Sequence, residues 1–508
     1  MSPRAGSLAA PPRVDAVVVG LAALAVYARS IAFGFTGLDD LDLIVDDQPF
    51  LADPSSLWRV FGRAYMHVVD ASHAYWRPLV TWTFALDAQW SGARPFGYHV
   101  TNVVLHLAAC VLVLVLVGSF GLGRGPALAA TLVFAVHPAL ASAVAWVPGR
   151  NDTLLAVLAL GAWIAWSRGR AGVHLGLFAL ALLTKETAVA LPLVWAVHAA
   201  LMKGGPRGRK LVVFGIGWCA LVGGRVLLHA SDVSVTSAHL QLLTGALGEL
   251  VLPLRPSCIA VAEDIPVWPG VVGLVVLGVA AWRTPGVRVG VLALGAATFV
   301  LLLLPSLLLG GTLVVGSRLY LPAVGVVLVV GEIVRALALE GRTLAAFAGV
   351  TTAVLGLLTA AFEGTFHDPR AFARDAVAGS PHSALAHLCL GRSAQLDGQD
   401  DLALAEYEQA LSLGPAEVVH NDVAVLYMKH ARWTEAEREL RAELVVSPRY
   451  ATAYFNLGVV LRRQERMDEA CAAEQEAVRL GADDDATLRE RDRDCATAAS
   501  ASPSGRSR

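Results

Sequence analysis

The sequence has 508 residues, of which 56% are hydrophobic and only 16% are charged, and its formal net charge is −2 at pH 7. Soluble domains carry about 25% charged residues, so much of this chain is predicted to lie in a membrane. The near-zero net charge argues against a nucleic-acid partner, which requires a basic face.

Apolar runs separated by short polar breaks fill residues 14–362, after a short N-terminus at 1–13. A spanning helix needs about 20 apolar residues, and we predict an all-α, polytopic membrane helix bundle of eleven or twelve spans. The predicted segments are 14–35, 99–118, 125–140, 152–166, 173–184, 187–202, 211–229, 242–260, 268–282, 289–309, 319–335 and 343–362. The segment 242–260 is also compatible with a re-entrant loop, because it contains Pro253 and Pro256.

Basic residues mark one set of short loops, including Arg4, Arg13 and the segment "KGGPRGRK" at 203–210. Lys and Arg are enriched in cytoplasmic loops, so this set and the N-terminus are predicted to be cytoplasmic. With 242–260 re-entrant, the extracytoplasmic side receives the long loop 36–98 and everything after residue 362.

The loop 36–98 opens with "GLDDLDLIVDD", which places five aspartates within nine positions directly after the first predicted span. The loop is also rich in aromatic residues, namely Trp58, Tyr75, Trp76, Trp82, Trp90 and Tyr98. Such residues favour the headgroup level of a bilayer. The loop is therefore predicted to lie along the membrane surface as amphipathic helices.

His99, Asn102 and His106 follow at spacings that align them on one helical face. Ionisable groups that head an apolar span face a cavity or a partner. Packing or a hydrogen bond to substrate is expected of these residues. No metal site is predicted, since the two histidines are two turns apart and lack a third ligand.

Each further polar break on the predicted extracytoplasmic side contributes a cation. The charged and polar residues are Arg77, Arg150 with Asp152, Lys185 with Glu186, and Arg318 with Tyr320. Separate cations and carboxylates on one side of a membrane fit a phosphate leaving group and a general base. They equally fit structural ion pairs that stabilise loop ends, so the residues alone leave both interpretations open.

The C-terminal part, 367–482, repeats itself. Residues 390–415, 423–448 and 457–482 superimpose without gaps, which defines three repeat units at 384–416, 417–450 and 451–483, with half a further unit at 370–381. Small residues recur where two helices of a hairpin must approach closely, at Gly391, Ala424 and Gly458 and at Ala403, Ala436 and Ala470. A period of 33–34 residues with these marks resembles the tetratricopeptide repeat, an α-solenoid that binds peptides or proteins. The array could alternatively brace the membrane part.

The last segment, 484–508, is charged and then rich in serine, so it is predicted to be a disordered tail. The six cysteines show no CxxC pair and no paired spacing. Neither a disulfide nor a metal role is predicted for them.

Five motifs occur in the order expected of one family: "GFTGLDDLDLI", "YWRPLVTWTFALDAQWSGARPFGYHVTNVVLHL", "FAVHPALASAVAWVPGRND", "LLTKETAVALP" and "LYLPAVG". With the repeats behind them, they resemble the transmembrane and tetratricopeptide repeat-containing protein O-mannosyltransferases and their bacterial homologues. The resemblance implies a multi-span glycosyltransferase that moves mannose, with inversion, from a polyisoprenyl-phosphate donor to protein Ser or Thr. It implies no required cofactor, and a divalent metal is compatible but not demanded.

The resemblance also implies roles for residues. An acidic pair in the first extracytoplasmic loop, here Asp39 and Asp40, supplies the catalytic base, while Asp42, Asp46 and Asp47 are expected to be solvated. From their positions in the family's motifs, the residues expected to bind the donor phosphate are Arg77, Arg150, Lys185 and Arg318. Substrate-binding or structural roles are expected for His99, Asn102, His106, Asp152, Glu186 and Tyr320.

This sequence departs from the family where Gly316 and Ser317 stand in place of the usual acid and arginine of the last membrane motif, so Arg318 would act from a position shifted by one. Only about three repeats are present. In this respect the chain resembles a shorter, bacterial member of the family, which would lie in an inner membrane.

Three classes of function remain open. The first is transfer to protein, with transfer to a lipid or glycan acceptor as its enzymatic alternative. The second is a non-catalytic membrane-anchored scaffold in which the repeats gather partners. The third is a transporter, against which the membrane half shows no internal repeat.

Overall fold

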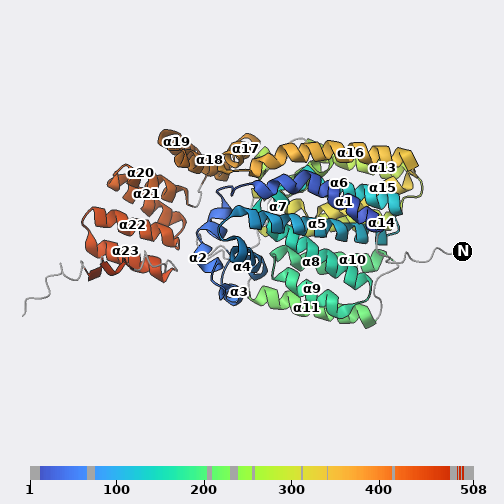
Figure 1. Cartoon of the computed structure of the whole chain (residues 1–508), viewed down its shortest axis with the longest axis horizontal. Coiled ribbons are helices and arrows are strands. Elements are labelled where there is room, and N and C mark those ends of the chain that lie inside the picture. The colour runs from blue at the N-terminus through green and yellow to red at the C-terminus, as the bar shows by residue number, and fades with distance from the viewer. Residues whose placement is uncertain are drawn as a thin grey trace, which may run out of the picture.

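The computed structural model describes residues 12–65, 75–202, 209–228, 238–253, 258–309, 313–339, 341–414 and 418–480, with 489, 491–493 and 495–496 near the C-terminal end (Figure 1). The chain is all-α: apart from one pair of three-residue strands, its regular elements in this described part are helices. Figure 1 shows a bundle of helices that run side by side, with the repeat helices gathered at one end.

Every one of the twelve predicted apolar segments contains a helix. These are α1 (Arg13–Tyr27), α5 (Pro95–Ser119), α6 (Arg124–Ala135), α8 (Arg150–Ser167), α9 (Ala171–Leu182), α10 (Leu191–Leu201), α11 (Arg209–Leu228), α12 (Ala238–Val251), α13 (Trp268–Arg283), α14 (Val289–Leu309), α15 (Ala323–Ala336) and α16 (Gly341–Phe362). The loop after α1 adds α2 (Gln48–Leu51), α3 (Ser56–Arg59) and α4 (Pro78–Ser91), and α7 (Ala141–Ala145) follows a 3-10 turn. Periodicity and apolar runs therefore located the helices correctly.

The number of full-length spans is lower than predicted. Within the described residues, four helical stretches are long and apolar enough to cross a membrane: Arg13–Ala32, Pro95–Ser119, Val289–Leu308 and Gly341–Phe366. The pair Arg124–Ala135 and Pro138–Ala145, bent by 56°, would make a fifth as one broken span. Other apolar helices, such as Ala171–Leu182, fall short of the length that the prediction of eleven or twelve spans assumed. By length and composition, the chain is a multi-pass membrane protein.

Arginines from the predicted cytoplasmic loops are tied together at the bundle end away from the repeats. Arg124 at the start of α6 pairs with Asp15 of α1 at 2.8 Å, and Arg335 pairs with Glu332 at 2.6 Å. Arg288 binds the same glutamate and donates to the Phe120 carbonyl at the end of α5. These contacts join loop residues that are distant in sequence, while the side of the membrane on which they lie stays a prediction.

The repeat part consists of α17 (Pro369–Gly379) and three helix pairs: α18 (Ala384–Leu396) with α19 (Asp400–Ser412), α20 (Val419–Lys429) with α21 (Trp433–Val446), and α22 (Ala451–Arg463) with α23 (Met467–Arg479). The predicted close approaches are present. A methyl group on Gly391 would lie 2.4 Å from the Tyr407 ring, and one on Gly458 would lie 2.5 Å from Glu474. Glycine is needed at both positions because the facing side chain occupies that space.

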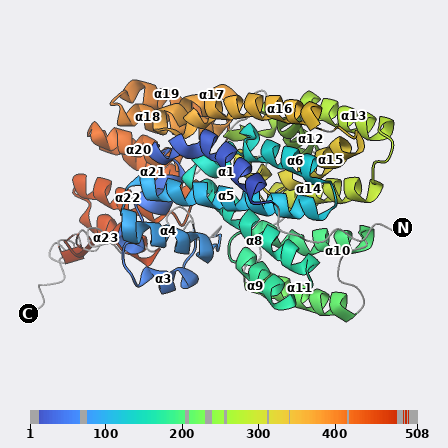
Figure 2. The same ribbon diagram turned by 45° about the vertical axis from the view of Figure 1, so that its right-hand side comes forward.

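A shared apolar core joins the first repeat helices to the membrane part. It combines Phe33 and Leu38 from the chain after α1, Trp146 after α7, Ile259 of a short strand, and Phe372 and Cys389 of α17 and α18. That strand, β1 (Ile259–Val261), pairs antiparallel with β2 (Leu313–Val315). Figure 2 shows α17 and α18 beside the end of α16 in a second view. The repeats are therefore packed onto the bundle end that carries the acidic stretch.

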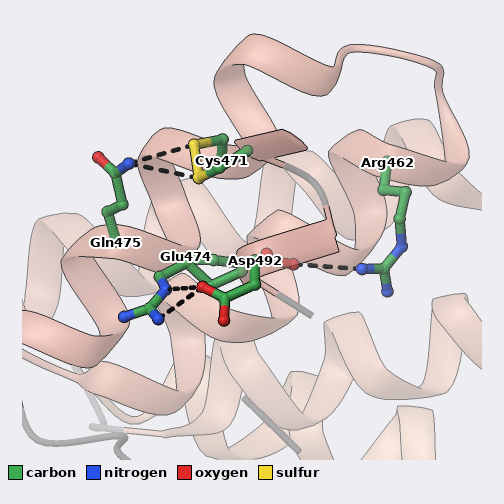
Figure 3. Close-up of a disulfide and its surroundings, with 7 residues drawn as sticks. Arg462, Cys471, Glu474, Gln475 and Asp492 are labelled. Atoms are coloured by element: carbon green, nitrogen blue, oxygen red, sulfur yellow. Dashed lines mark hydrogen bonds and ion pairs between the residues drawn. A yellow bond between two sulfur atoms is a disulfide. The ribbon is translucent and has the colours of Figure 1, made fainter. Parts of the chain in front are cut away.

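Cys471 and Cys495 form a disulfide, which corrects the prediction that the cysteines have no such role (Figure 3). A sequence separation of 24 residues gave no spacing signal. The bond ties the C-terminal segment to α23, the last repeat helix (Figure 3). Most of the predicted disordered tail lies outside the described residues, but Cys495 within it is held in place.

Candidate active site

The acidic pair lies where the chain leaves the first candidate span and turns toward the repeats. Gly37 makes this turn with φ +78°, against Pro369 at the start of α17. The π-helix η2 (Leu41–Val45) begins directly after Asp40. The turn places Asp39 and Asp40 between the bundle and the repeat helices.

Asp40 is completely buried, and it is held through one carboxylate oxygen, Oδ2, while Oδ1 has no hydrogen-bond partner in the described residues. Its carboxylate accepts hydrogen bonds from the backbone amide of Thr36, at 2.7 Å, and from the Thr36 hydroxyl. The same hydroxyl accepts a hydrogen bond from the Trp146 indole at 3.1 Å. Burial raises the pKa of Asp40 to about 6, against the opposing effect of these hydrogen bonds. Its geometry is that of a residue that fixes the local backbone.

Asp39 has a raised pKa like that of Asp40, but it differs from Asp40 in exposure and in hydrogen bonding. Its side chain is only half-buried, and within the described part of the chain it makes no hydrogen bond. Burial and the neighbouring Asp40 carboxylate raise the pKa of Asp39 to about 6, against the charges of Arg77, Arg318 and Arg392. A carboxylate of this kind is ionised at neutral pH and can accept a proton.

Arg77 stands at the start of α4 and is held in one orientation. Its Nη2 donates to Glu186 at 2.8 Å and its Nε donates to the same carboxylate at 3.1 Å, so the pair is bidentate. The rings of Tyr65 and Tyr75 lie 5.0 and 4.6 Å from the guanidinium carbon. A rigid guanidinium with aromatic neighbours is well suited to bind an oxyanion.

Lys185 and Arg318 complete a group of cations around this end. The Lys185 ammonium donates to Asp152 of α8 at 2.6 Å, and burial lowers its pKa to about 8 against the effect of Asp152. Arg318 lies in the 3-10 turn η8 (Gly316–Leu319) after β2 and donates to the Ser306 carbonyl at 3.3 Å. The charges of Arg77 and Arg318 both act on Lys185 and on Asp39. The structure thus brings together cations from three separate sequence motifs.

Arg150 has a different environment from the other predicted phosphate ligands. It is fully buried, and its nitrogens bind Asp87 at 2.6 Å, Asn102 at 2.8 Å and the Tyr98 carbonyl at 2.7 Å. The Phe84 ring lies 4.6 Å from the guanidinium carbon. Arg150 therefore ties α8 to α4 and α5, and we place it in a structural role.

The polar face of α5 is likewise bound within the protein. His99 contacts the Gly34 carbonyl at 3.2 Å, and the Asn102 amide donates to the Trp146 carbonyl at 3.0 Å. His106 lies 2.6 Å from the Tyr320 hydroxyl and 3.0 Å from the Ala135 carbonyl. The polar side chains on this face of α5 therefore have partners within the protein, which favours the packing role over a hydrogen bond to substrate. In the described ranges, no group of three or more His, Cys, Asp or Glu side chains is arranged to hold a metal ion.

The acidic stretch also contacts the repeat part electrostatically, which the sequence did not predict. Arg392 of α18 pairs with Asp422 of α20 at 2.6 Å. Its charge opposes the effect of burial, which raises the pKa of Asp42 to about 7. Asp47 was expected to be solvated but is buried and paired with Arg63 at 2.7 Å. Part of the negative charge of the acidic stretch therefore interacts with the first repeat.

The fold and these contacts define an all-α multi-pass membrane protein that carries tetratricopeptide repeats and a carboxylate among cations at one bundle end. A family model described as tetratricopeptide repeat matches residues 423–485. The chain is 33% identical over 174 residues to "Protein O-mannosyl-transferase TMTC1" of Homo sapiens. It is 31% identical over 225 residues to "Protein O-mannosyl-transferase TMTC4" of Mus musculus.

These matches are partial. They cover 33% and 38% of this chain, and 19% and 30% of the two relatives. The chain thus shares a distant similarity with these mannosyltransferases across about a third of its own length. Among solved structures, one titled "Crystal structure of APC/C hetero-tetramer Cut9-Hcn1" covers 82% of the chain at 12% identity with a TM-score of 0.24.

Proposed function

We propose that the chain is a membrane glycosyltransferase that moves a sugar from a polyisoprenyl-phosphate carrier to Ser or Thr of a protein, with inversion. The observation that carries this proposal is Asp39, a half-buried carboxylate without a hydrogen bond in the described residues, under the influence of Arg77 and Arg318. The partial similarity to the O-mannosyltransferases supports mannose as the sugar.

The proposed chemistry follows from these groups. Asp39 takes the proton of an acceptor hydroxyl as its oxygen attacks the anomeric carbon from the face opposite the phosphate, and the bond from that carbon to the phosphate oxygen breaks. The leaving phosphate gains one negative charge, which nearby cations stabilise. Because the phosphate leaves without protonation, one carboxylate is sufficient, unlike the pair that a glycosidase uses.

The extracytoplasmic placement of the site is part of the proposal. Disulfides persist in oxidising compartments, and the Cys471–Cys495 bond supports such a compartment for the repeats. The repeats pack on the bundle end that carries Asp39, so both lie on one side. The repeats are proposed to hold the acceptor protein beside the acidic stretch.

Purified chain in lipid vesicles tests the proposal, with radiolabelled polyprenyl-phosphate-mannose as donor and a bacterial membrane-protein fraction as acceptor. We expect label on protein that alkaline β-elimination releases, since this treatment cleaves O-linked sugar from Ser and Thr. Label in the lipid or glycan fraction instead would favour the alternative acceptor. Labelling no higher than in protein-free vesicles, with glucose and galactose donors also tried, would support the scaffold.

The rate of transfer is expected to have a bell-shaped pH dependence. Asp39 must be ionised, so kcat/KM should rise with pH through about 6. Lys185 must be protonated, so kcat/KM should fall again through about 8. Asp152→Asn removes the carboxylate that raises the pKa of Lys185, and it should move the alkaline limb to lower pH while the acid limb stays. Identical limbs in both proteins would refute the role of Lys185.

A further inference from the structure

Arg225 is a single charged residue in the apolar stretch near the end of α11. Its side chain is only 6% exposed. Nη2 donates to Glu186 at 3.3 Å and to the Trp76 carbonyl at 3.2 Å, and the Trp76 ring lies 5.3 Å from the guanidinium carbon. An arginine in such surroundings is costly to bury, so it normally serves a partner or a pathway.

Two of the three nitrogens of Arg225 lack a hydrogen-bond acceptor. Nε and Nη1 are buried, and in the described part of the chain neither has a hydrogen-bond partner. Buried donors of this kind are rare in native proteins and call for an explanation, because each loses its hydrogen bonds to water without replacing them. A bound anion would supply the missing acceptor oxygens.

The charges around Arg225 also favour an anion. Glu186 is shared, since Arg77 occupies it bidentately at 2.8–3.3 Å while Arg225 contacts the same carboxylate. Two guanidinium groups and one carboxylate give this triad a net charge of +1, and its side chains are at most 12% exposed. A buried net charge is unfavourable unless a counter-ion joins it.

We propose that Arg225, with Arg77 beside it, binds the phosphate of the lipid-linked donor. This assignment rests on the proposed function and adds a phosphate ligand that no sequence motif indicated. The donor diester carries one negative charge and the lipid monophosphate product up to two. The guanidinium forks therefore bind the leaving group more tightly as the bond to the sugar breaks.

Binding of polyprenyl monophosphate tests the assignment without requiring transfer. The full chain in nanodiscs is titrated with the radiolabelled lipid, and wild type is compared with Arg225→Gln and Arg225→Lys. Arg94→Gln serves as the matched control, because Arg94 is exposed at the start of α5. We expect Arg225→Gln to weaken binding about 10–100-fold, Arg225→Lys to weaken it less and the control to leave it unchanged.

Three results would overturn the assignment. The first is wild-type affinity of Arg225→Gln for the lipid phosphate together with a lower melting temperature, since Arg225 would then only brace Trp76 and Glu186. The second is equal binding of uncharged polyprenol. The third is equal binding of inorganic phosphate. If binding depends on Arg225 but no sugar is transferred, the phosphate site stands and the proposed function fails.

Discussion

Asp39→Asn is expected to reduce sugar transfer by about 10²–10⁴-fold, the usual contribution of a general base. The substitution keeps the size of the side chain and removes only its ability to take a proton. Because the Asp39 side chain makes no hydrogen bond in the described residues, we expect melting temperature and binding of polyprenyl phosphate to stay near wild type. The measurement is single-turnover transfer from radiolabelled polyprenyl-phosphate-mannose. The matched control is Asp46→Asn, an exposed aspartate of the same stretch, which should transfer normally.

Asp40→Asn distinguishes the two members of the pair. An asparagine oxygen can still accept the hydrogen bonds of Thr36, so the local backbone should hold. Loss of the Asp40 charge removes an influence that raises the pKa of Asp39, so the acid limb of the pH profile should move below 6. Abolished transfer in Asp40→Asn with normal transfer in Asp39→Asn would reverse the assignment of the base.

The sequence could predict features that depend on local pattern. Apolar runs located the twelve helices of the predicted spans, and the small residues at Gly391 and Gly458 predicted the close contacts within repeat helix pairs. Both signals depend on neighbours within about one or two helical turns or one repeat. The length of a continuous span does not, because the 3-10 turn after His137 interrupts the predicted segment 125–140, and helices such as Ala171–Leu182 end before they reach spanning length.

The sequence could not rank the cations. Arg77 and Arg150 both follow a polar break, but their partners are distant in sequence: Glu186 for Arg77, and Asp87 for Arg150. Whether a guanidinium is partly exposed or sealed inside depends on how three helices pack. Arg225 is the opposite case, because the sequence did carry a signal that our prediction did not use. A single arginine within an apolar run indicates an intramembrane functional group.

The repeat part shows the same limit. Its helices follow from sequence periodicity, but its place against the acidic stretch depends on a core assembled from five separate segments, including Leu38, Trp146 and Cys389. Arg392 therefore had no sequence signal linking it to Asp39 and Asp42. The packing makes the first repeat part of the surroundings of the candidate base, which gives the repeats a reason to be fused to the membrane part.

Arg150→Met is expected to lower the free energy of unfolding by about 3–5 kcal/mol, because it leaves Asp87 buried without its counter-charge. It also removes the donors to Asn102 and to the Tyr98 carbonyl, which join α8 to α5. Denaturant unfolding in detergent micelles measures the loss. The double variant Arg150→Met, Asp87→Leu should recover much of it, since replacing both members of a buried pair with apolar side chains is often nearly neutral.

The same variant separates a structural arginine from a phosphate ligand. A structural Arg150 predicts that the double variant, once stable, binds polyprenyl phosphate like wild type, whereas Arg77→Gln loses affinity without a comparable loss of stability. Normal stability of Arg150→Met with weakened phosphate binding would restore Arg150 to the donor site. In that case the Arg150 guanidinium would have to release Asp87 and bind the donor phosphate in its place, because all three of its nitrogens already have partners within the protein.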